Sequence, residues 1–438
     1  MALTRLGGSR RGRRRARELG SWLAEEERRD RFGREAVALL ELAGASANAW
    51  APALTAGLQA RDAGRLGEAG RLLDLAAGSA APPAVRVAAL RARAEVARLA
   101  GDYARAVANH EQLECELAGE CMERGQDLVG WGRSLWGLRR PREASARLLE
   151  GIAMLQPLLP EPVAAREVAR GLATLRRIAD VLPGVALPPH RPEDFAGRGT
   201  PRDRYVIAAS LGVLAAECGD LDAAVVHHRE AVDRARSAHL HSAVVTALYD
   251  LGRIERRRGD REAARAHLSE CERLAAALGR NPMLARVHNE LGELYRGIGA
   301  SESAVHHYQE AASLQSLVAG PAPRLAVLNL ARMHAESGRG DLGREALVAL
   351  EADEELADWI RGPLSLTVAL CEAGQDDASA QAHLRQGLAT LSASHEARLG
   401  AIEILDLLAE RWESSDEEAA AREARSAARV LAAALDRA

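Results

Sequence analysis

Small and apolar residues recur at a fixed interval in the middle of the chain. The dipeptide Leu-Gly occurs at Leu211-Gly212, Leu251-Gly252 and Leu291-Gly292, at intervals of 40 residues. Three other positions keep the same interval: glycine at 219, 259 and 299, alanine at 224, 264 and 304, and glutamate at 230, 270 and 310. A fixed period of roughly 20–50 residues is typical of stacked units that cannot bury their apolar faces alone. The pattern therefore predicts an all-α solenoid.

Each unit is predicted to be a pair of helices, and the first, residues 205–236, shows why. Its first half places apolar residues at helical spacing, namely Val206, Ile207, Leu211 and Leu214. Gly212 leaves room on that apolar face for a second helix. Gly219 suits the left-handed residue that ends a helix, and Asp220 can accept a bond from the free N–H groups of the next one.

These positions resemble the tetratricopeptide repeat. The third unit shows the pattern most fully, with Leu291-Gly292, Tyr295, Gly299, Ala304, Tyr308 and Ala311. The first two units lack the aromatic residue and have Ala215 and Glu255 there. The usual repeat has about 34 residues, so the longer period resembles the long-helix variety of kinesin light chains and bacterial peptide-sensing regulators. The resemblance implies a right-handed superhelical solenoid of about eight or nine antiparallel helix pairs.

Weaker copies of the pattern and a break divide the rest of the chain. We expect a basic tail and capping helices over residues 1–48, and degenerate repeats over 49–182. A Pro- and Gly-rich linker or loop follows over 183–204, and whether it is a hinge or an ordered loop stays open. The main array is expected over 205–395, and a capping helix pair over 396–438 with Asp416 as the N-cap of its second helix.

The composition limits the binding partners and the cellular compartment that we expect for this chain. The 438 residues are 47% apolar but only 3% aromatic, which favours Ala, Leu and Val helix contacts, and the net charge of −4 gives no general attraction to nucleic acid or membrane. The chain has five cysteines without a Cys-x-x-Cys motif. With no apolar signal peptide or membrane-spanning stretch, this predicts a cytoplasmic protein. The resemblance to bacterial peptide-sensing regulators implies a bacterial one.

Arginine is the only strongly basic residue, since the chain has no lysine. An N-terminal cluster is the sole hint of nucleic-acid binding, and it comprises Arg10, Arg11, Arg13, Arg14, Arg15 and Arg17. We read this cluster as a solvated tail that runs into a helix.

The resemblance implies that the first helix of each pair lines a concave groove. The candidate groove residues are Tyr249, Arg253, Arg256, Arg257, Arg286, Asn289, Glu293, Arg296, Asn329 and Arg332. Guanidinium groups can hold carboxylates bidentately, so a partner segment with acidic side chains is one hypothesis. The alternative is that the arginines solvate a helix end, where positive charge also suits the helix dipole.

Catalytic and metal-binding motifs are not found. His227, His267 and His307 repeat with the period, but equivalent residues of stacked helices lie about 10 Å apart, whereas zinc ligands lie about 2.1 Å from the metal. We therefore expect a structural or surface histidine ladder, with no metal and no cofactor. The sequence has no P-loop, no Gly-x-Ser-x-Gly and no His-Glu-x-x-His, which argues against an enzyme.

The expected function is therefore a scaffold or adaptor that binds a protein or peptide in its groove. The alternative is a sensory module that binds a peptide or small ligand and controls a kinase or transcription factor. Self-assembly through the end helices is a further alternative.

Overall fold

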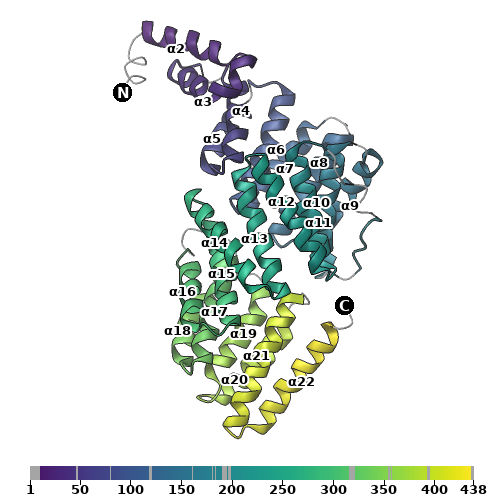
Figure 1. Ribbon diagram of the computed structural model, residues 1–438, viewed down its shortest axis with the longest axis vertical. Helices are drawn as coiled ribbons and strands as arrows, with labels where there is room; N and C mark the ends of the chain where they lie inside the picture. The colour runs from purple at the N-terminus through teal and green to yellow at the C-terminus, as the bar shows by residue number, and fades with distance from the viewer. Residues whose placement is uncertain are drawn as a thin grey trace. The chain divides into compact units, whose positions relative to one another are not determined.

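The protein is a stack of α-helices. The computed structural model describes residues 10–435 apart from 46–47, 79, 118–120, 160, 180, 183, 190–194, 196–198, 315–320, 354–355, 357 and 392–394 (Figure 1). These residues form 21 α-helices and no strand, which confirms the all-α fold class. The described residues thus contain more helices than the 16 to 18 that the predicted eight or nine pairs would supply.

Unit 1 is one of two compact units, and it comprises Met1–Ile178, Val185–Arg258 and Arg273–Arg280. Its helices are α2 (Arg10–Leu23), α3 (Glu26–Leu42), α4 (Trp50–Asp62), α5 (Leu66–Ala76), α6 (Pro83–Leu99), α7 (Tyr103–Glu116), α8 (Cys121–Gly137), α9 (Pro141–Leu155), α10 (Pro162–Ala179), α11 (Pro201–Glu217), α12 (Leu221–Ser237) and α13 (His241–Arg258). Consecutive helices pack as pairs, such as α8 with α9 and α11 with α12.

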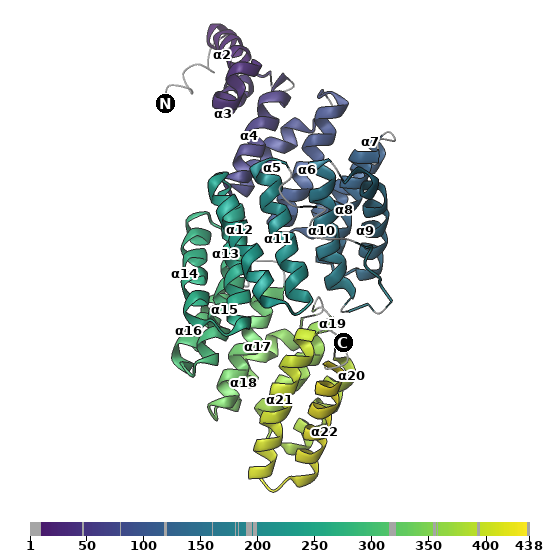
Figure 2. The same cartoon turned by 45° about the vertical axis from the view of Figure 1, so that its right-hand side comes forward.

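Unit 2 comprises Ala179–Gly184, Gly259–Glu272 and Asn281–Ala438. The helix α14 (Arg261–Ala277) belongs mainly to it, and the others are α15 (Asn281–Gly297), α16 (Ser301–Ser313), α17 (Pro321–Glu336), α18 (Gly340–Glu351), α19 (Asp358–Glu372), α20 (Asp377–Thr390), α21 (His395–Ser414) and α22 (Glu418–Leu435). Figures 1 and 2 both show α21 and α22 side by side as an antiparallel pair.

A glycine on the first helix of a pair faces a large side chain 16 residues later on the second. The pairs are Gly57 with Leu73, Gly132 with Leu148, Gly212 with His228, and Gly292 with Tyr308. A Cβ at Gly212 would lie 2.7 Å from Nε2 of His228, closer than side chains approach one another. The three predicted contact glycines, 212, 252 and 292, are all buried. The repeated small residue therefore sets how closely the two helices of a pair approach.

The turn between the helices of a pair also follows the prediction. Gly219 has φ +84°, a left-handed conformation that glycine adopts without steric cost. Asp220 is the N-cap of α12, and its Oδ1 accepts a hydrogen bond from the backbone N–H of Ala223 at 2.9 Å. Asp102 caps α7 in the same way through Arg105 N.

The buried His228 should make the free energy of unfolding depend on pH. It is 1% exposed, and burial lowers its pKa to about 4 from the ordinary value of about 6.5. Between those values the unfolded chain binds more protons than the folded chain, so the free energy of unfolding falls as the pH falls from 6.5 to 4. At pH 5 the loss is about 2 kcal/mol relative to neutral pH.

Leucine occupies the equivalent position in two other pairs, at Leu73 and Leu148. We therefore expect His228→Leu to fold and to remove about 2 kcal/mol of the acid sensitivity. Urea unfolding at pH 7.5 and pH 5, followed by circular dichroism, measures the difference. The neighbouring, partly exposed His227 supplies the control, and His227→Leu should remove much less of the acid sensitivity than His228→Leu does. Equal pH dependence of native protein and His228→Leu would contradict the assignment.

The segment predicted as a linker belongs to unit 1 from Val185 onward, whereas Gly184 belongs to unit 2. The helix α11 begins at Pro201, where Thr200 and Asp203 form a reciprocal capping box. The backbone oxygen of Pro189 accepts a hydrogen bond from Gln156 Nε2 at 3.3 Å, and Phe195 is fully buried. Residues 183, 190–194 and 196–198 lie outside the described part of the chain.

One expectation about the C-terminal end of the chain differs from the structure. Asp416 was expected to cap the last helix, but it lies in the turn with φ +62°, and α22 begins at Glu418. A short polar side chain tolerates the left-handed conformation that this tight turn requires. The N-terminal arginines lie on α2, where Arg14 pairs with Glu18, whereas residues 1–9 lie outside the described chain.

Candidate functional site

The first helices of the pairs in unit 2 contact one another and carry a connected set of polar residues. The helix α15 packs on α17, α17 on α19, and α19 on α21. Their polar residues are Asn289, Glu293 and Arg296 on α15, Asn329 and Arg332 on α17, and Glu403 on α21. We call this set the unit 2 polar face.

The two asparagines on the unit 2 polar face form a direct pair. Asn329 Nδ2 donates to Asn289 Oδ1 at 3.0 Å, although the residues lie 40 positions apart. A side-chain amide has one acceptor oxygen and one NH2 group. The pair therefore still presents the NH2 group of Asn289 and the oxygen of Asn329. One donor beside one acceptor complements the C=O and N–H groups of a peptide backbone.

The charged members of the unit 2 polar face are already paired. Glu403 accepts from Arg296 at 3.1 Å and from Arg332 at 2.6 Å. Arg296 also pairs with Glu293 at 3.0 Å, and Arg332 with Glu336 at 2.8 Å. Burial alone would lower the pKa of Arg296, but Glu293 and Glu403 raise it above its ordinary value. These arginines are therefore fixed in position and carry no excess positive charge.

Tyr308 connects the interior of a helix pair to the unit 2 polar face. Its ring is fully buried against Gly292, and its hydroxyl donates to Glu293 Oε1 at 2.7 Å. Burial raises the pKa of Tyr308, and the adjacent carboxylate of Glu293 raises it further. The hydroxyl therefore stays protonated and acts as a donor that positions Glu293.

The ten predicted groove residues are divided between the two units. Four lie on α13 in unit 1, where Tyr249 is buried, Arg253 and Arg256 are partly exposed, and Arg257 is exposed. The other six are on α15 and α17, and all of these except the exposed Arg286 belong to the unit 2 polar face. Sequence reasoning missed Glu403, because it lies 107 residues from Arg296 and has no local signal.

Unit 1 has a second polar set, on the helices that face its interior. Glu95 of α6 accepts from Arg61 of α4 at 3.0 Å, from Arg170 of α10 at 3.4 Å and from Arg202 of α11 at 3.5 Å. Burial alone would raise the pKa of Glu95, but the three arginines hold it well below its ordinary value. Other charged residues of these helices pair with this set or with one another. We call the whole group the unit 1 interior cluster, and its members are Arg61, Asp62, Glu95, Arg166, Glu167, Arg170, Arg202 and Asp203.

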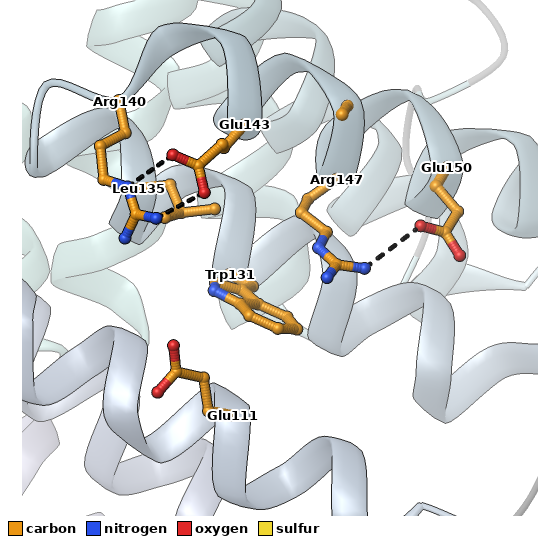
Figure 3. A pocket seen from close by; sticks show the side chains of 8 residues that line it. Glu111, Trp131, Leu135, Arg140, Glu143, Arg147 and Glu150 are labelled. Carbon is orange, nitrogen blue, oxygen red and sulfur yellow. Dashed lines mark hydrogen bonds and ion pairs between the residues drawn. The ribbon is translucent and has the colours of Figure 1, made fainter.

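A surface pocket of about 290 Å³ lies between α7, α8 and α9 (Figure 3). Arg147 lies over the ring of Trp131, with 4.2 Å between the guanidinium carbon and the ring centroid, and also pairs with Glu150 at 3.6 Å. Arg140 pairs with Glu143 at 2.6 Å, and Figure 3 shows Glu111 on the opposite wall. The charges are mostly compensated within the pocket, which gives it no clear preference for one ligand charge.

The repeated histidines do not come together. His227 is partly exposed on α12, His267 is on α14, and His307 stacks on Tyr295 with ring centroids 5.2 Å apart. Within the described ranges, no three His, Cys, Asp or Glu side chains are grouped as a metal site would require. Among the helices that the structure describes, none is both long and apolar enough to cross a membrane.

Comparisons with known proteins agree with this architecture. Residues 205–277 and 244–316 match the family model described as tetratricopeptide repeat. A Rap protein complexed with Competence and Sporulation Factor is similar in structure, with a TM-score of 0.53 and 13% identity over 89% of this chain and 99% of that one. The apo quorum sensor NprR from B. thuringiensis has a TM-score of 0.52 and 13% identity over 87% and 97%.

A search with the sequence against curated proteins finds no match. Stacked antiparallel helix pairs and the two similar folds define the class, which is the α-helical repeat protein. Residues 205–316 contain the tetratricopeptide repeats that the family model recognises, and the chain as a whole has the stacked helix-pair fold of such proteins.

Proposed function

We propose that this chain is a non-enzymatic scaffold or adaptor that binds an extended peptide segment of a partner protein along the unit 2 polar face. The observation that carries the proposal is the Asn289–Asn329 pair, which is partly exposed and presents one donor and one acceptor. A peptide backbone offers the matching groups whatever its side chains are, so the pair would hold the backbone while neighbouring positions select the sequence.

The comparisons support binding as the kind of function. The similar Rap structure contains a bound Competence and Sporulation Factor, and NprR is described as a quorum sensor. This fold therefore accommodates a bound factor in at least one protein of similar length. Acidic side chains are not required in our proposal for unit 2, because three carboxylates already neutralise Arg296 and Arg332.

Removing both asparagine side chains should weaken peptide binding about tenfold or more, since two hydrogen bonds to the backbone are lost. A displayed library of random peptides is selected on the purified full chain, and the best peptide is labelled. Fluorescence anisotropy then compares native protein with Asn289→Ala/Asn329→Ala.

The control for this experiment is Gln309→Ala, an exposed position on the second helix α16. It should bind the peptide as tightly as the native protein. Equal affinity of the double asparagine variant, or a library without any saturable binder, would contradict the proposal.

A sensory role is the second candidate, and the likeness to the NprR fold favours it. In that case the bound peptide or ligand would change the affinity of the chain for a kinase or transcription factor. Adding the selected peptide to a pull-down would distinguish the two roles, because a scaffold keeps its partner and a sensor gains or releases one.

We place the protein in the cytoplasm. All five cysteines are free, and Cys115, Cys121 and Cys218 are exposed. Exposed free thiols are suited to a reducing compartment.

A further inference from the structure

Helices of unit 1 that lie far apart in the sequence contact one another around a shared interior. The helices α4 and α13 are in contact, and Arg202 of α11 pairs with Asp62 of α4 at 2.7 Å, although these two residues lie 140 positions apart. Glu95 of α6 meets arginines from α4, α10 and α11. Helices that are not neighbours in sequence therefore converge on one interior, and that interior is lined by charged side chains.

Four carboxylates in the unit 1 interior cluster are matched by four arginines. The carboxylates are Asp62, Glu95, Glu167 and Asp203, and the arginines are Arg61, Arg166, Arg170 and Arg202. Asp203 pairs with Arg166 at 2.7 Å, and Glu167 with Arg166 at 2.8 Å and Arg170 at 3.3 Å. These eight groups neutralise one another.

Two further arginines, Arg98 and Arg133, lie beside this cluster, and neither has such a partner. Arg98 lies one helical turn after Glu95 on α6, and Arg133 lies on α8, which packs against α6. Both residues are partly exposed. Within the described chain, neither makes a hydrogen bond or an ion pair. The interior therefore has two uncompensated positive charges with donors that solvent can reach.

The surroundings of these two arginines disfavour their charge. Burial is the main cause that holds the pKa of Arg133 well below its ordinary value, followed by the like charges of Arg98 and Arg170. Burial also lowers the pKa of Arg98, although the nearby Glu95 opposes the change. Two such charges lower the stability of the folded chain unless an anion neutralises them. Their presence therefore indicates a bound anion.

Tyr205 of α11 adds a neutral donor to the same region. Burial raises the pKa of its hydroxyl, the carboxylate of Asp250 raises it further, and Arg170 and Arg98 oppose the change. No hydrogen bond fixes this hydroxyl within the described residues, and it remains free to turn toward a ligand.

We propose that Arg98 and Arg133 bind a dianionic phosphoryl group of a small ligand inside unit 1. A phosphoryl group neutralises both charges at once and offers three acceptor oxygens to guanidinium groups. A carboxylate brings one charge and leaves the other uncompensated. We assign a small phosphate ester as the ligand class, because the ion pairs of Arg202 with Asp62 and of Glu95 with its arginines already join the surrounding helices to one another.

The test uses inorganic phosphate and phenyl phosphate as probes for the full chain, by isothermal titration calorimetry at pH 7.5. Saturable binding of one phosphate per chain is expected, and Arg98→Gln and Arg133→Gln should each weaken it at least about tenfold. Acetate at equal ionic strength should show no saturable binding. Arg71→Gln on α5 removes the same charge from an exposed site and should bind phosphate as the native protein does.

Thermal unfolding provides a second measurement. Without phosphate, Arg133→Gln should melt about 2 °C higher than the native protein, because it removes a charge that has no partner. With saturating phosphate, only the native protein and Arg71→Gln should gain stability.

Three results would overturn the proposal. They are the absence of saturable phosphate binding, equal binding by native protein and both interior variants, and acetate binding as tight as that of phosphate. A phosphoserine pentapeptide that binds tenfold more tightly than phenyl phosphate would overturn the assignment to a small ligand. None of these measurements involves the unit 2 polar face, so they succeed or fail independently of peptide binding.

Discussion

Replacing Gly292 by valine is expected to lower the free energy of unfolding by about 3 kcal/mol, because added bulk in a packed contact forces neighbouring atoms apart. A Cβ at this position would overlap the Tyr308 ring, which is fully buried and cannot move into solvent. Urea unfolding followed by circular dichroism at 222 nm measures the change.

Gly297 supplies a matched control on the same helix. It is exposed, and a Cβ there would have no atom within 4 Å. Gly297→Val should therefore change stability by less than about 0.5 kcal/mol. Tyr308→Ala removes the ring that faces Gly292. In that background, Gly292→Val should lower the free energy of unfolding much less than it does in the native protein. Equal costs in the two backgrounds would show that the glycine–tyrosine contact does not set the helix spacing.

Truncating Trp412 to alanine is expected to lower the free energy of unfolding by about 4 kcal/mol, a value typical of a large aromatic side chain in a core. Trp412 on α21 is fully buried, and its Nε1 donates to Asp377 Oδ1 at 2.8 Å. The side chain joins α21 to the start of α20, so its loss should loosen the C-terminal pairs first.

Trp412→Phe separates the ring from the hydrogen bond. Asp377 Oδ1 still accepts from the backbone N–H of Gly374 at 2.7 Å, so no acceptor is left without a donor. The expected cost is about 1–2 kcal/mol. Hydrogen exchange should show lost protection in α20–α22 for Trp412→Ala and little change in α2–α5. Uniform loss of protection across the chain would contradict a local role.

The candidate site was predictable only in part. The periodic spacing placed Asn289 and Asn329 at equivalent positions of successive first helices, and the structure joins them by a hydrogen bond. The same reasoning treated Arg296 and Arg332 as free to hold a partner's carboxylates. The structure pairs both with Glu403, a residue from a later helix that no spacing rule connects with them.

The sequence by itself determined the helix pair. A glycine and a large residue 16 positions later meet inside one antiparallel pair, and a Gly-Asp turn lies between them. These interactions are local, so residue spacing is enough to specify them.

Only the tertiary structure decided which charges meet. Glu95 contacts Arg61, Arg170 and Arg202, which are 34, 75 and 107 residues away. Stacking brings side chains from several turns of the solenoid to one interior, and each small rotation between successive pairs contributes to where they meet. The total rotation between distant helix pairs cannot be deduced from residue spacing. For this reason residue spacing did not indicate that Arg98 and Arg133 would lie in the same interior without a carboxylate paired to either.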